Sequence, residues 1–387
     1  MNILYVVSRP LEINSSATIR NLATIKGLLS LGHDIDVITS KPDKNHDKFD
    51  ESLVIDGINK IYVDLHGLNK AINLSRKIKI MTHLRKYGYK LYNKINIYDN
   101  LKDIVNYIDK VNINYNKYDI IISSSDPKSS HLFVYKLYEK GYVKESTPWI
   151  QIWGDPFLID ITRRNKLLSF KIKKEEKKLF KYAKKIIYVS PLTLNEQKNI
   201  YSEYKEKMYF IPIPYLEKKI FPKINLNKES LVFLYCGDYF SDLRNILPLY
   251  EAISETNHKL IICGDSDIKL KNKRNIEILP RQSLEKVKEL EEQCDVLVHL
   301  SNLKGTQIPG KIYQYCGTNK IILFIKEDNN LKLKETFDKY NRFVFSNNNI
   351  KELRNVINNI SLGIYNEMQF VLEDFNPNKI AKQIIDI

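Results

Sequence analysis

The sequence predicts an α/β protein built from two doubly wound, Rossmann-like domains. Short runs rich in Val, Ile and Tyr alternate with segments of helical periodicity along the chain, which is typical of parallel sheets with crossover helices. The alternation stops near the middle at a polar, proline-containing stretch and then restarts. The length of 387 residues also exceeds what one hydrophobic core usually organises, so we expect two domains.

The first half of the chain contains strand candidates separated by helical patterns. The strand candidates are ILYVV, DIDVIT, KIYVDL, DIIISS, WIQIW and KIIYVS. The helical patterns cover Ala17–Leu31, Asn100–Val111, Lys128–Lys140 and Phe170–Ala183. We therefore expect residues 1–212 to form the first Rossmann-like domain.

The same order of elements returns in the second half. The strand candidates there are LVFLYC, KLIICG, IEIL, DVLVHLS, KIILFI and RFVFS. The helical patterns cover Arg244–Glu255, Ser283–Gln293, Pro309–Gly317 and Ile350–Ile360. We expect a linker over residues 213–229, a second domain over 230–363, and a C-terminal segment 364–387 whose helix returns to the first domain. Two such domains facing each other would form a cleft, and ligands of these sheets bind beyond the carboxyl ends of the strands.

Composition excludes several classes of protein. Hydrophobic residues make up 43% of the chain, an ordinary share for a globular protein, and no apolar run approaches the roughly 20 residues that cross a bilayer. The N-terminal MNILYVVSRP is typical of a buried strand rather than of a signal peptide. The cysteines are Cys236, Cys263, Cys294 and Cys316. No two of them form a CxxC pair, so we expect reduced thiols in a cytoplasmic protein and no zinc site.

The net charge of +15 is unevenly distributed. Arg163–Lys185 holds eleven basic residues against two acidic ones, and Lys70–Lys94 is a second basic stretch with apolar residues and tyrosines between the charges. These stretches are either solvated helix faces or surfaces that attract anionic lipid or a phosphate-bearing acceptor. Nucleic acid is not an expected partner, because no helix-turn-helix, zinc-finger or RNP-like signature accompanies the charge.

A nicotinamide-dependent dehydrogenase is the main competing protein with two such domains. Its dinucleotide site requires a GxGxxG turn after the first strand of a domain. The first strand candidate of the first half is followed by SRPLEINSSATIR, and that of the second half by GDYFSDLR. Neither segment contains the motif, so the dehydrogenase hypothesis is not supported.

The turn KGTQIPGKIYQY lies between two strand candidates and precedes a short helical pattern. Backbone N–H groups at a helix N-terminus can bind an anion. Lys311 falls in the first helical turn, where its charge opposes the helix dipole. An anionic ligand would account for a lysine at that position.

Five segments, taken together and in order, resemble one known family. They are GLLSLGHDIDVITS, LFKYAKKIIYVSPLT, FIPIPY, FLYCGDYFSDLRNILPLYEAI and CDVLVHLS followed by IPGKIYQYCGTNKIILFI. The chain resembles glycosyltransferases of the GT-B fold, above all the family 4 group of bacterial surface-polysaccharide assembly. The resemblance covers nearly the whole chain. Its Lys-x-x-Gln-Tyr helix is also similar to that of the xanthan-type glucuronosyltransferases.

This resemblance implies transfer of a sugar from a nucleotide diphosphate donor in the second domain to an acceptor held by the first. The leaving diphosphate needs cations and fixed dipoles near it. Lys311 and Arg244, the latter at the start of an expected helix, would clamp the diphosphate, and Gln314 would accept hydrogen bonds from the ribose. The other donor-binding residues that the resemblance indicates are Gly237, Arg281 near the nucleobase, Thr306, Gln307, Pro309, Gly310, Tyr315 and, in the first domain, Ser15, Ser16 and Arg20.

The chain departs from the family pattern in its carboxylates. Many members carry glutamate at the position of Gln314 and a second glutamate eight residues earlier, where this chain has Thr306 followed by Gln307. Retention or inversion of the anomeric configuration therefore stays open. An inverting reaction needs a general base, for which Asp155 is the first candidate and Asp126 the second. Turn or helix-capping roles are the alternatives for both aspartates.

The function that we expect is a glycosyltransferase of surface-polysaccharide assembly. We expect a UDP-sugar rather than a GDP-sugar as donor, a lipid-linked saccharide as acceptor, and neither a metal nor another cofactor in the site. The location would be the cytoplasm, with peripheral association to the inner face of the plasma membrane. A catalytically silent GT-B protein that binds a partner transferase and a nucleotide-sugar epimerase are the alternatives.

Overall fold

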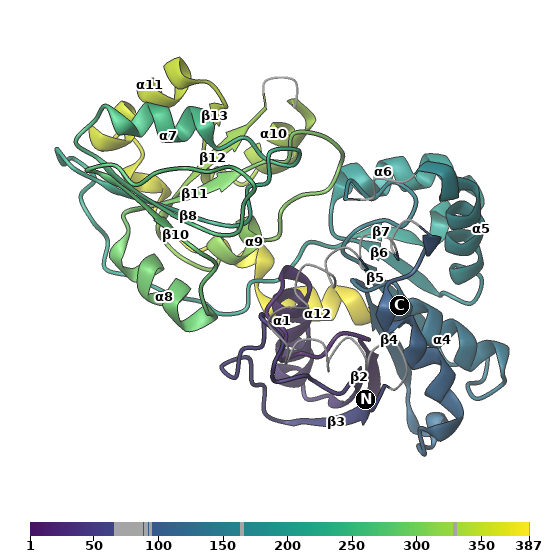
Figure 1. The fold of residues 1–387 in the computed structure, drawn as a ribbon. Helices are drawn as coiled ribbons and strands as arrows, with labels where there is room; N and C mark the ends of the chain where they lie inside the picture. The colour runs from purple at the N-terminus through teal and green to yellow at the C-terminus, as the bar shows by residue number, and fades with distance from the viewer. Residues whose placement is uncertain (66–87, 89–91, 93–94, 163–165, 328–330, 387) are drawn as a thin grey trace. The chain divides into compact units, whose positions relative to one another are not determined.

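The computed structural model describes residues 1–65, 88, 92, 95–162, 166–327 and 331–386. The chain forms two compact units (Figure 1). Unit 1 comprises Met1–Pro212 and Pro377–Ile387, and unit 2 comprises Ile213–Asn376. Most of the basic stretch 70–94 lies outside the described residues.

Unit 1 contains a seven-stranded sheet in which all neighbouring strands are parallel, in the order β3-β2-β1-β4-β5-β6-β7. The strands are β1 (Asn2–Val6), β2 (Asp34–Ser40), β3 (Ile58–Val63), β4 (Ile120–Ser124), β5 (Trp149–Trp153), β6 (Lys185–Tyr188) and β7 (Met208–Phe210). The described α-helices are α1 (Ser16–Ser30), α4 (Ser129–Glu139), α5 (Ser169–Leu179), α6 (Pro191–Ile200) and α12 (Pro377–Ile385). The 3-10 helices are η2 (Asn100–Lys110), η3 (Tyr115–Lys117), η4 (Lys166–Leu168) and η5 (Ser202–Lys207).

The central strands of unit 1 are buried on both faces, as expected for a parallel sheet covered by helices. Every residue of β4 and β5 is buried, including Trp149 and Trp153. The predicted helix at Asn100–Val111 is instead a 3-10 helix, η2, which begins where the Asp99 side chain accepts a hydrogen bond from Leu101 N.

Unit 2 contains a six-stranded sheet that is also parallel throughout, in the order β10-β9-β8-β11-β12-β13. The strands are β8 (Val232–Cys236), β9 (Lys259–Cys263), β10 (Ile276–Leu279), β11 (Val296–Leu300), β12 (Ile321–Lys326) and β13 (Phe343–Asn347). The helices are α7 (Leu247–Ser254), α8 (Leu284–Gln293), α9 (Lys311–Tyr315), α10 (Leu331–Asp338) and α11 (Ile350–Ser361), with the 3-10 turns η6 (Asn366–Met368) and η7 (Glu373–Phe375). Both sheets have the strand order of a Rossmann fold, so the predicted fold class is confirmed.

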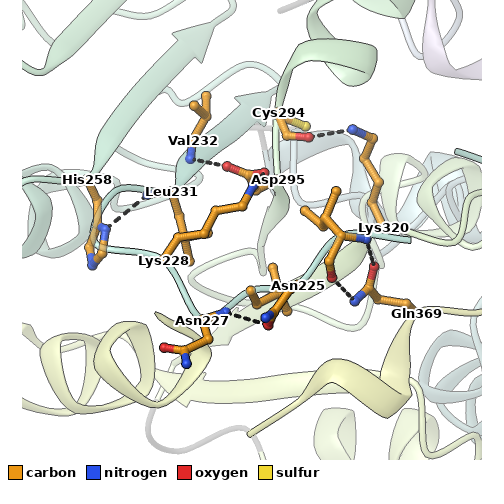
Figure 2. A network of polar contacts seen from close by, with 12 residues as sticks. Asn225, Asn227, Lys228, Leu231, Val232, His258, Cys294, Asp295, Lys320 and Gln369 are labelled. Carbon is orange, nitrogen blue, oxygen red and sulfur yellow. Dashed lines mark hydrogen bonds and ion pairs between the residues drawn. The ribbon is translucent and has the colours of Figure 1, made fainter. Parts of the chain in front are cut away.

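Residues 213–229, which the sequence indicates as a linker, belong to unit 2. Ile224 exchanges two hydrogen bonds with the Gln369 side chain, and Lys228 Nζ lies 3.1 Å from an Asp295 oxygen. Figure 2 shows this network, in which Asp295 also accepts a hydrogen bond from Val232 N. The Gln369 amide thus satisfies the backbone of Ile224, and the ion pair of Lys228 with Asp295 fixes the segment to the unit.

The C-terminal segment is divided between the units. Residues 364–376, expected on the first domain, belong to unit 2, whereas Pro377–Ile387 belongs to unit 1. There α12 packs against α1 so closely that a Cβ on Gly27 would collide with the Pro377 carbonyl oxygen. Lys185 Nζ donates to the backbone carbonyls of Gln383 and Asp386 at 2.8 and 2.6 Å. The lysine thus satisfies backbone carbonyl groups at and just after the C-terminal end of α12.

Candidate functional site

The strand order of each sheet reverses at one point, between β1 and β4 in unit 1 and between β8 and β11 in unit 2. Ligands of doubly wound sheets bind outside the carboxyl ends of the strands at such a point. Charged side chains gather there in both units. The unit 1 cluster is Arg20, Asp126, Lys128, Asp155 and Asp160; the unit 2 cluster is Asp238, Arg244, Asp265, Arg281, Glu291 and Lys311.

In unit 2, a Cys-Gly-Asp triplet follows both β8 and β9. Gly264, in the second triplet, lies so close to the first that a Cβ there would collide with the Gly237 carbonyl oxygen. Both triplet aspartates bind Arg281: Asp265 accepts from Nε at 3.1 Å, and Asp238 accepts from Nη2. Burial alone would lower the pKa of Arg281, but the two carboxylates raise it. The Arg281 guanidinium is therefore held by the two aspartates. The predicted contact of Arg281 with the nucleobase would then be made by its backbone.

Arg244 lies in the loop after β8 rather than at the start of a helix. The helix α7 begins three residues later, where the Asn245 side chain accepts a hydrogen bond from Leu247 N. Arg244 Nε donates to the Asn302 side chain at 3.1 Å and Nη1 donates to the Asp238 carbonyl at 2.6 Å. Arg244 forms no ion pair with any residue that the structure describes, so its charge is not neutralised by a carboxylate.

Lys311 shares a buried carboxylate with a second lysine. The Glu291 side chain is 8% exposed, and its two oxygens lie 3.0 Å from Nζ of Lys311 and 3.0 Å from Nζ of Lys219. Burial would raise the pKa of Glu291, but the two lysines lower it. Burial likewise disfavours the charge of Lys311, and Glu291 raises the pKa of that lysine above its ordinary value. Two lysines and one carboxylate leave one excess positive charge at this position.

The turn before α9, residues 304–310, is held by a buried asparagine of the same unit. Asn302 Nδ2 donates to the Gln307 carbonyl at 2.9 Å, so one asparagine fixes both this turn and Arg244. Gln307 is buried, and Thr306, Pro309 and Gly310 are partly exposed. Because α9 has only five residues, its dipole is small, and the charge of Lys311 is the stronger attraction for an anion here.

The side chain of Gln314 points to the segment that enters unit 2, not to Lys311. Its oxygen accepts from Leu216 N at 2.8 Å and its nitrogen donates to the Pro214 carbonyl at 3.1 Å. The predicted ribose contact therefore depends on the second lone pair of the same oxygen. Tyr315 is buried, with its ring centroid 5.3 Å from Lys311 Nζ.

In unit 1, three aspartates surround Lys128. Its Nζ lies 2.5 Å from Asp126 and 2.7 Å from Asp160. Burial opposes ionisation of Asp160, but Lys128 lowers the pKa of that carboxyl. Burial together with the charges of Asp126 and Asp160 raises the pKa of Asp155 to about 8. Both predicted base candidates, Asp155 and Asp126, are thus brought together beside one buried lysine.

Arg20 projects from α1, and its guanidinium lies against Gly154, the residue after β5. It is 5% exposed, and its Nε and Nη2 atoms have no hydrogen-bond partner among the described residues. A Cβ on Gly154 would require this guanidinium to shift. Burial lowers the pKa of Arg20, and the charges of Asp126 and Asp155 oppose that effect. A contact with the donor phosphate stays a prediction for this buried side chain.

The two serines before Arg20 have different surroundings. Ser15 is the N-cap of α1, and its Oγ accepts a hydrogen bond from Thr18 N at 3.1 Å. Ser16 is exposed at the first helical position. The Ser15 hydroxyl is thus engaged in capping, whereas Ser16 could reach a ligand.

Two buried histidines, His131 and His299, have structural surroundings. Burial lowers the pKa of His131 well below its ordinary value, and burial lowers the pKa of His299 to about 3. The His131 ring lies 4.2 Å from Trp153 and the His299 ring 4.6 Å from Phe324. No cluster of three or more metal-ligating side chains occurs in the described part of the chain. Among the described helices, none has the length and hydropathy needed to cross a bilayer.

Sequence reasoning missed several residues of both clusters. They are Lys128, Asp160, Asp238, Asp265 and Glu291, and Asn302, which fixes Arg244 and the turn before α9, was missed as well. The repeated Cys-Gly-Asp triplet was a signal that could have found Asp238 and Asp265, because parallel strands end at the same edge of a sheet. Glu291 gave no such signal, since it lies within the charged helical segment KVKELEEQ.

Comparisons with known proteins identify the fold. No protein-family model matches the chain, and no curated protein matches it. A glycosyltransferase from Rickettsia africae is 16% identical, with a TM-score of 0.59, over 100% of this chain and 97% of its own. A trehalose-6-phosphate structure from E. coli bound with UDP-2-fluoro glucose is 10% identical, with a TM-score of 0.60, over 100% and 98%.

A third solved structure comes from a different class of enzyme. It is assigned as a UDP-N-acetylglucosamine 2-epimerase from Listeria monocytogenes and is 10% identical, with a TM-score of 0.52, over 100% of this chain and 94% of its own. At these identities the similarity concerns the fold, which transferases and this epimerase share. The chain therefore has the two-domain GT-B fold.

Proposed function

We propose that the chain is a glycosyltransferase that moves a sugar from a nucleotide diphosphate sugar to a saccharide acceptor. The observation that carries the proposal is the pair of cations, Arg244 and Lys311, at the switch point of unit 2. Arg244 forms no ion pair with a described residue. The two positive charges of Lys311 and Lys219 face only one negative charge, that of Glu291. A leaving diphosphate requires such fixed cations, because negative charge grows on it in the transition state.

The chemistry that we infer for unit 1 is acid–base catalysis. An acceptor hydroxyl attacks the anomeric carbon, the bond from that carbon to the diphosphate oxygen breaks, and a carboxylate takes the hydroxyl proton. Asp155 is the first candidate for this base and Asp126 the second. A base with a pKa of about 8 is suited to accept a proton near neutral pH. Thr306 stands where many members of the resembled family carry a glutamate, so retention and inversion both stay open. The anomeric configuration of the product should therefore be measured.

We infer a UDP-sugar rather than a GDP-sugar as the donor. The E. coli trehalose-6-phosphate structure binds UDP-2-fluoro glucose, and the Listeria protein is assigned to act on UDP-N-acetylglucosamine. The acceptor in this proposal is a lipid-linked saccharide of surface-polysaccharide assembly, met by the protein at the cytoplasmic face of the membrane. The lysine-rich helix α5 supports this location, because anionic lipids attract such a surface.

Isothermal titration of the purified chain with UDP, GDP and uridine tests the donor site. Lys311→Met should weaken UDP binding at least tenfold and leave uridine binding unchanged, since only the diphosphate contacts this charge. Glu291 keeps Lys219 as its partner in this variant. Lys304→Met, at an exposed lysine of the same turn, is the matched control and should change UDP affinity by less than twofold.

The outcomes separate the proposal from its alternatives. Failure of every nucleotide and nucleotide sugar to bind would overturn it. Interconversion of a UDP-sugar by the protein alone, without an acceptor, would identify an epimerase, which the similarity to the Listeria protein favours as the second candidate. Unchanged polymer production in cells that carry Lys311→Met and Asp155→Asn would indicate a silent partner of another transferase.

A further inference from the structure

Two bulky apolar side chains project from unit 1 where α5 begins. Leu167, in η4, is 93% exposed, and Phe170, in the first turn of α5, is 85% exposed. Among the described large hydrophobic side chains, these two have the highest exposed fractions. Complete exposure of a leucine or a phenylalanine to water is unfavourable relative to its burial. An external partner that covers them would remove this cost.

The exposure is not a consequence of a loosely packed helix. The opposite face of α5 is buried through Ile172, Glu176 and Leu179. Both Glu176 oxygens are engaged, one by Phe157 N at 2.8 Å and the other by the Tyr201 hydroxyl at 2.7 Å. The helix is therefore fixed by its own core face, and Phe170 on the outer face is not needed for packing.

Exposed lysines without an ion pair to any described residue accompany the two apolar side chains. Lys171, Lys173 and Lys174 are exposed, and none forms an ion pair with a described residue. Lys173 and Lys174 lie three and four residues after Phe170, so they share its side of the helix. The acidic residues of α5 do not offset these charges locally, because Glu176 is buried and Glu175 lies 3.1 Å from Lys178 Nζ.

We propose that residues 167–174 form a docking surface for an anionic lipid bilayer, with Leu167 and Phe170 entering the headgroup region and the three lysines contacting lipid phosphates. Interfacial helices combine these features, and they insert their apolar side chains about 5–10 Å into the boundary. This surface deepens the membrane location in the proposed function, but it does not depend on sugar transfer.

A bilayer fits this surface better than a protein does. The core of a protein interface is depleted in lysine and contains several contiguous apolar residues. Here Leu167 and Phe170 are followed by three exposed lysines within the eight residues LLSFKIKK. Lipid phosphates can neutralise such lysines at the level of the headgroups while the apolar side chains reach the acyl boundary.

Vesicle co-sedimentation with the full chain tests the proposal. The probes are vesicles of 30% phosphatidylglycerol in phosphatidylcholine and vesicles of phosphatidylcholine alone. The wild type should bind the anionic vesicles at least tenfold more tightly. The double variant Leu167→Ser/Phe170→Ser should lose at least tenfold in affinity. The triple variant Lys171→Gln/Lys173→Gln/Lys174→Gln should lose at least as much, together with most of the salt dependence, since each lysine contributes about fivefold.

Matched controls lie in unit 2. Ile220→Ser removes a side chain that is 72% exposed, and a triple glutamine variant of the exposed Lys269, Lys271 and Lys332 removes the same charge. Both should bind anionic vesicles within twofold of the wild type. Circular dichroism of every variant should match the wild type, because none of the altered side chains is buried.

Three results would overturn the inference. They are equal binding to both vesicle types, no vesicle binding at all, and wild-type binding by the double serine variant. Self-association that the serine variant loses, without vesicle binding, would reassign the surface to a protein contact. Transfer to a soluble acceptor without vesicle binding would reject the docking surface alone, whereas vesicle binding without nucleotide-sugar binding would reject the proposed function alone.

Discussion

Asp155, in unit 1, differs in its ionisation between the unfolded and the folded chain. Its pKa rises from an ordinary value of 3.8 to about 8, because burial and the charges of Asp126 and Asp160 disfavour the ionised carboxylate. The native state therefore retains a proton that the unfolded state releases. A raised carboxyl pKa lowers the free energy of unfolding progressively as pH increases from about 4 to about 8.

Asp155→Asn should remove this dependence. Relative to the wild type, the variant should gain stability between pH 5 and pH 8, by up to about 1.4 kcal/mol per pH unit, and the difference should be constant above about pH 9. Thermal denaturation over this pH range measures the effect. Asp34→Asn, at an exposed aspartate at the start of β2, is the control. A difference that shrinks as pH rises would contradict the assigned direction.

Glu291 offers a second test at the residue scale. Glu291→Gln leaves Lys219 and Lys311 without their shared counter-charge, and breaking a buried pair is costly. Because the lysines are 17% and 27% exposed, we expect a loss of about 2 to 3 kcal/mol in urea denaturation at pH 7. The loss should diminish as pH falls below 4.5, because the unfolded chain then takes up a proton that the lowered pKa of Glu291 keeps off the native state.

The control is Glu289→Gln on the same helix. Glu289 is 49% exposed and pairs with Lys286 at the surface, so its removal should change stability by less than about 1 kcal/mol. Equal losses for the two variants would show that Glu291 does not act as a buried counter-ion.

Sequence reasoning located the cations more readily than their partners. Arg244 and Lys311 were predicted because they follow strand candidates and fit the chemistry of a diphosphate. The partner of Lys311 lies 20 residues earlier on another helix, and only tertiary packing brings the two together. Gln314 shows a second limit, since the sequence did not reveal that its amide holds the backbone of Pro214 and Leu216.

At the scale of elements, most strands were predictable from composition. The strand candidates agree with the observed strands to within two residues, because buried parallel strands are continuous runs of β-branched and aromatic residues. The three-residue edge strand β7 was missed because MYF is too short to show a pattern. The helix α6 was missed because PLTLNEQKNI buries Thr193 and Gln197 as well as Leu194, which obscures the apolar face.

The contact of α1 with α12 can be tested through Gly27. Gly27→Val should displace α12, because even a Cβ at this position would collide with the Pro377 carbonyl. We expect a loss of about 2 to 3 kcal/mol and faster hydrogen exchange in residues 377–386. Lys26→Val, at the exposed neighbouring position, carries the cost of valine in a helix and should lose only about 0.5 kcal/mol. Similar losses for both variants would exclude the collision as the cause.

At the scale of the whole molecule, each unit has its own sheet and its own core. A ligand that binds the native state stabilises it by mass action. UDP at one hundred times its dissociation constant should therefore raise the free energy of unfolding of unit 2 by about 2.7 kcal/mol. Hydrogen exchange should slow most in the loops after β8 and β11. Uniform slowing across the β1–β7 sheet, with none in unit 2, would contradict a donor site there.

The two crossings between the units have a consequence for engineering. The chain enters unit 2 at Ile213 and leaves it at Asn376, and Tyr215 N donates to the Phe375 carbonyl at 3.1 Å. The segment that enters unit 2 and the segment that leaves it are thus neighbours. Unit 2 is therefore an insertion into unit 1 whose two ends lie side by side. A short loop from Pro212 to Pro377 could replace it without disconnecting α12. Unit 2 can therefore be exchanged as a cassette between chains that keep the same unit 1.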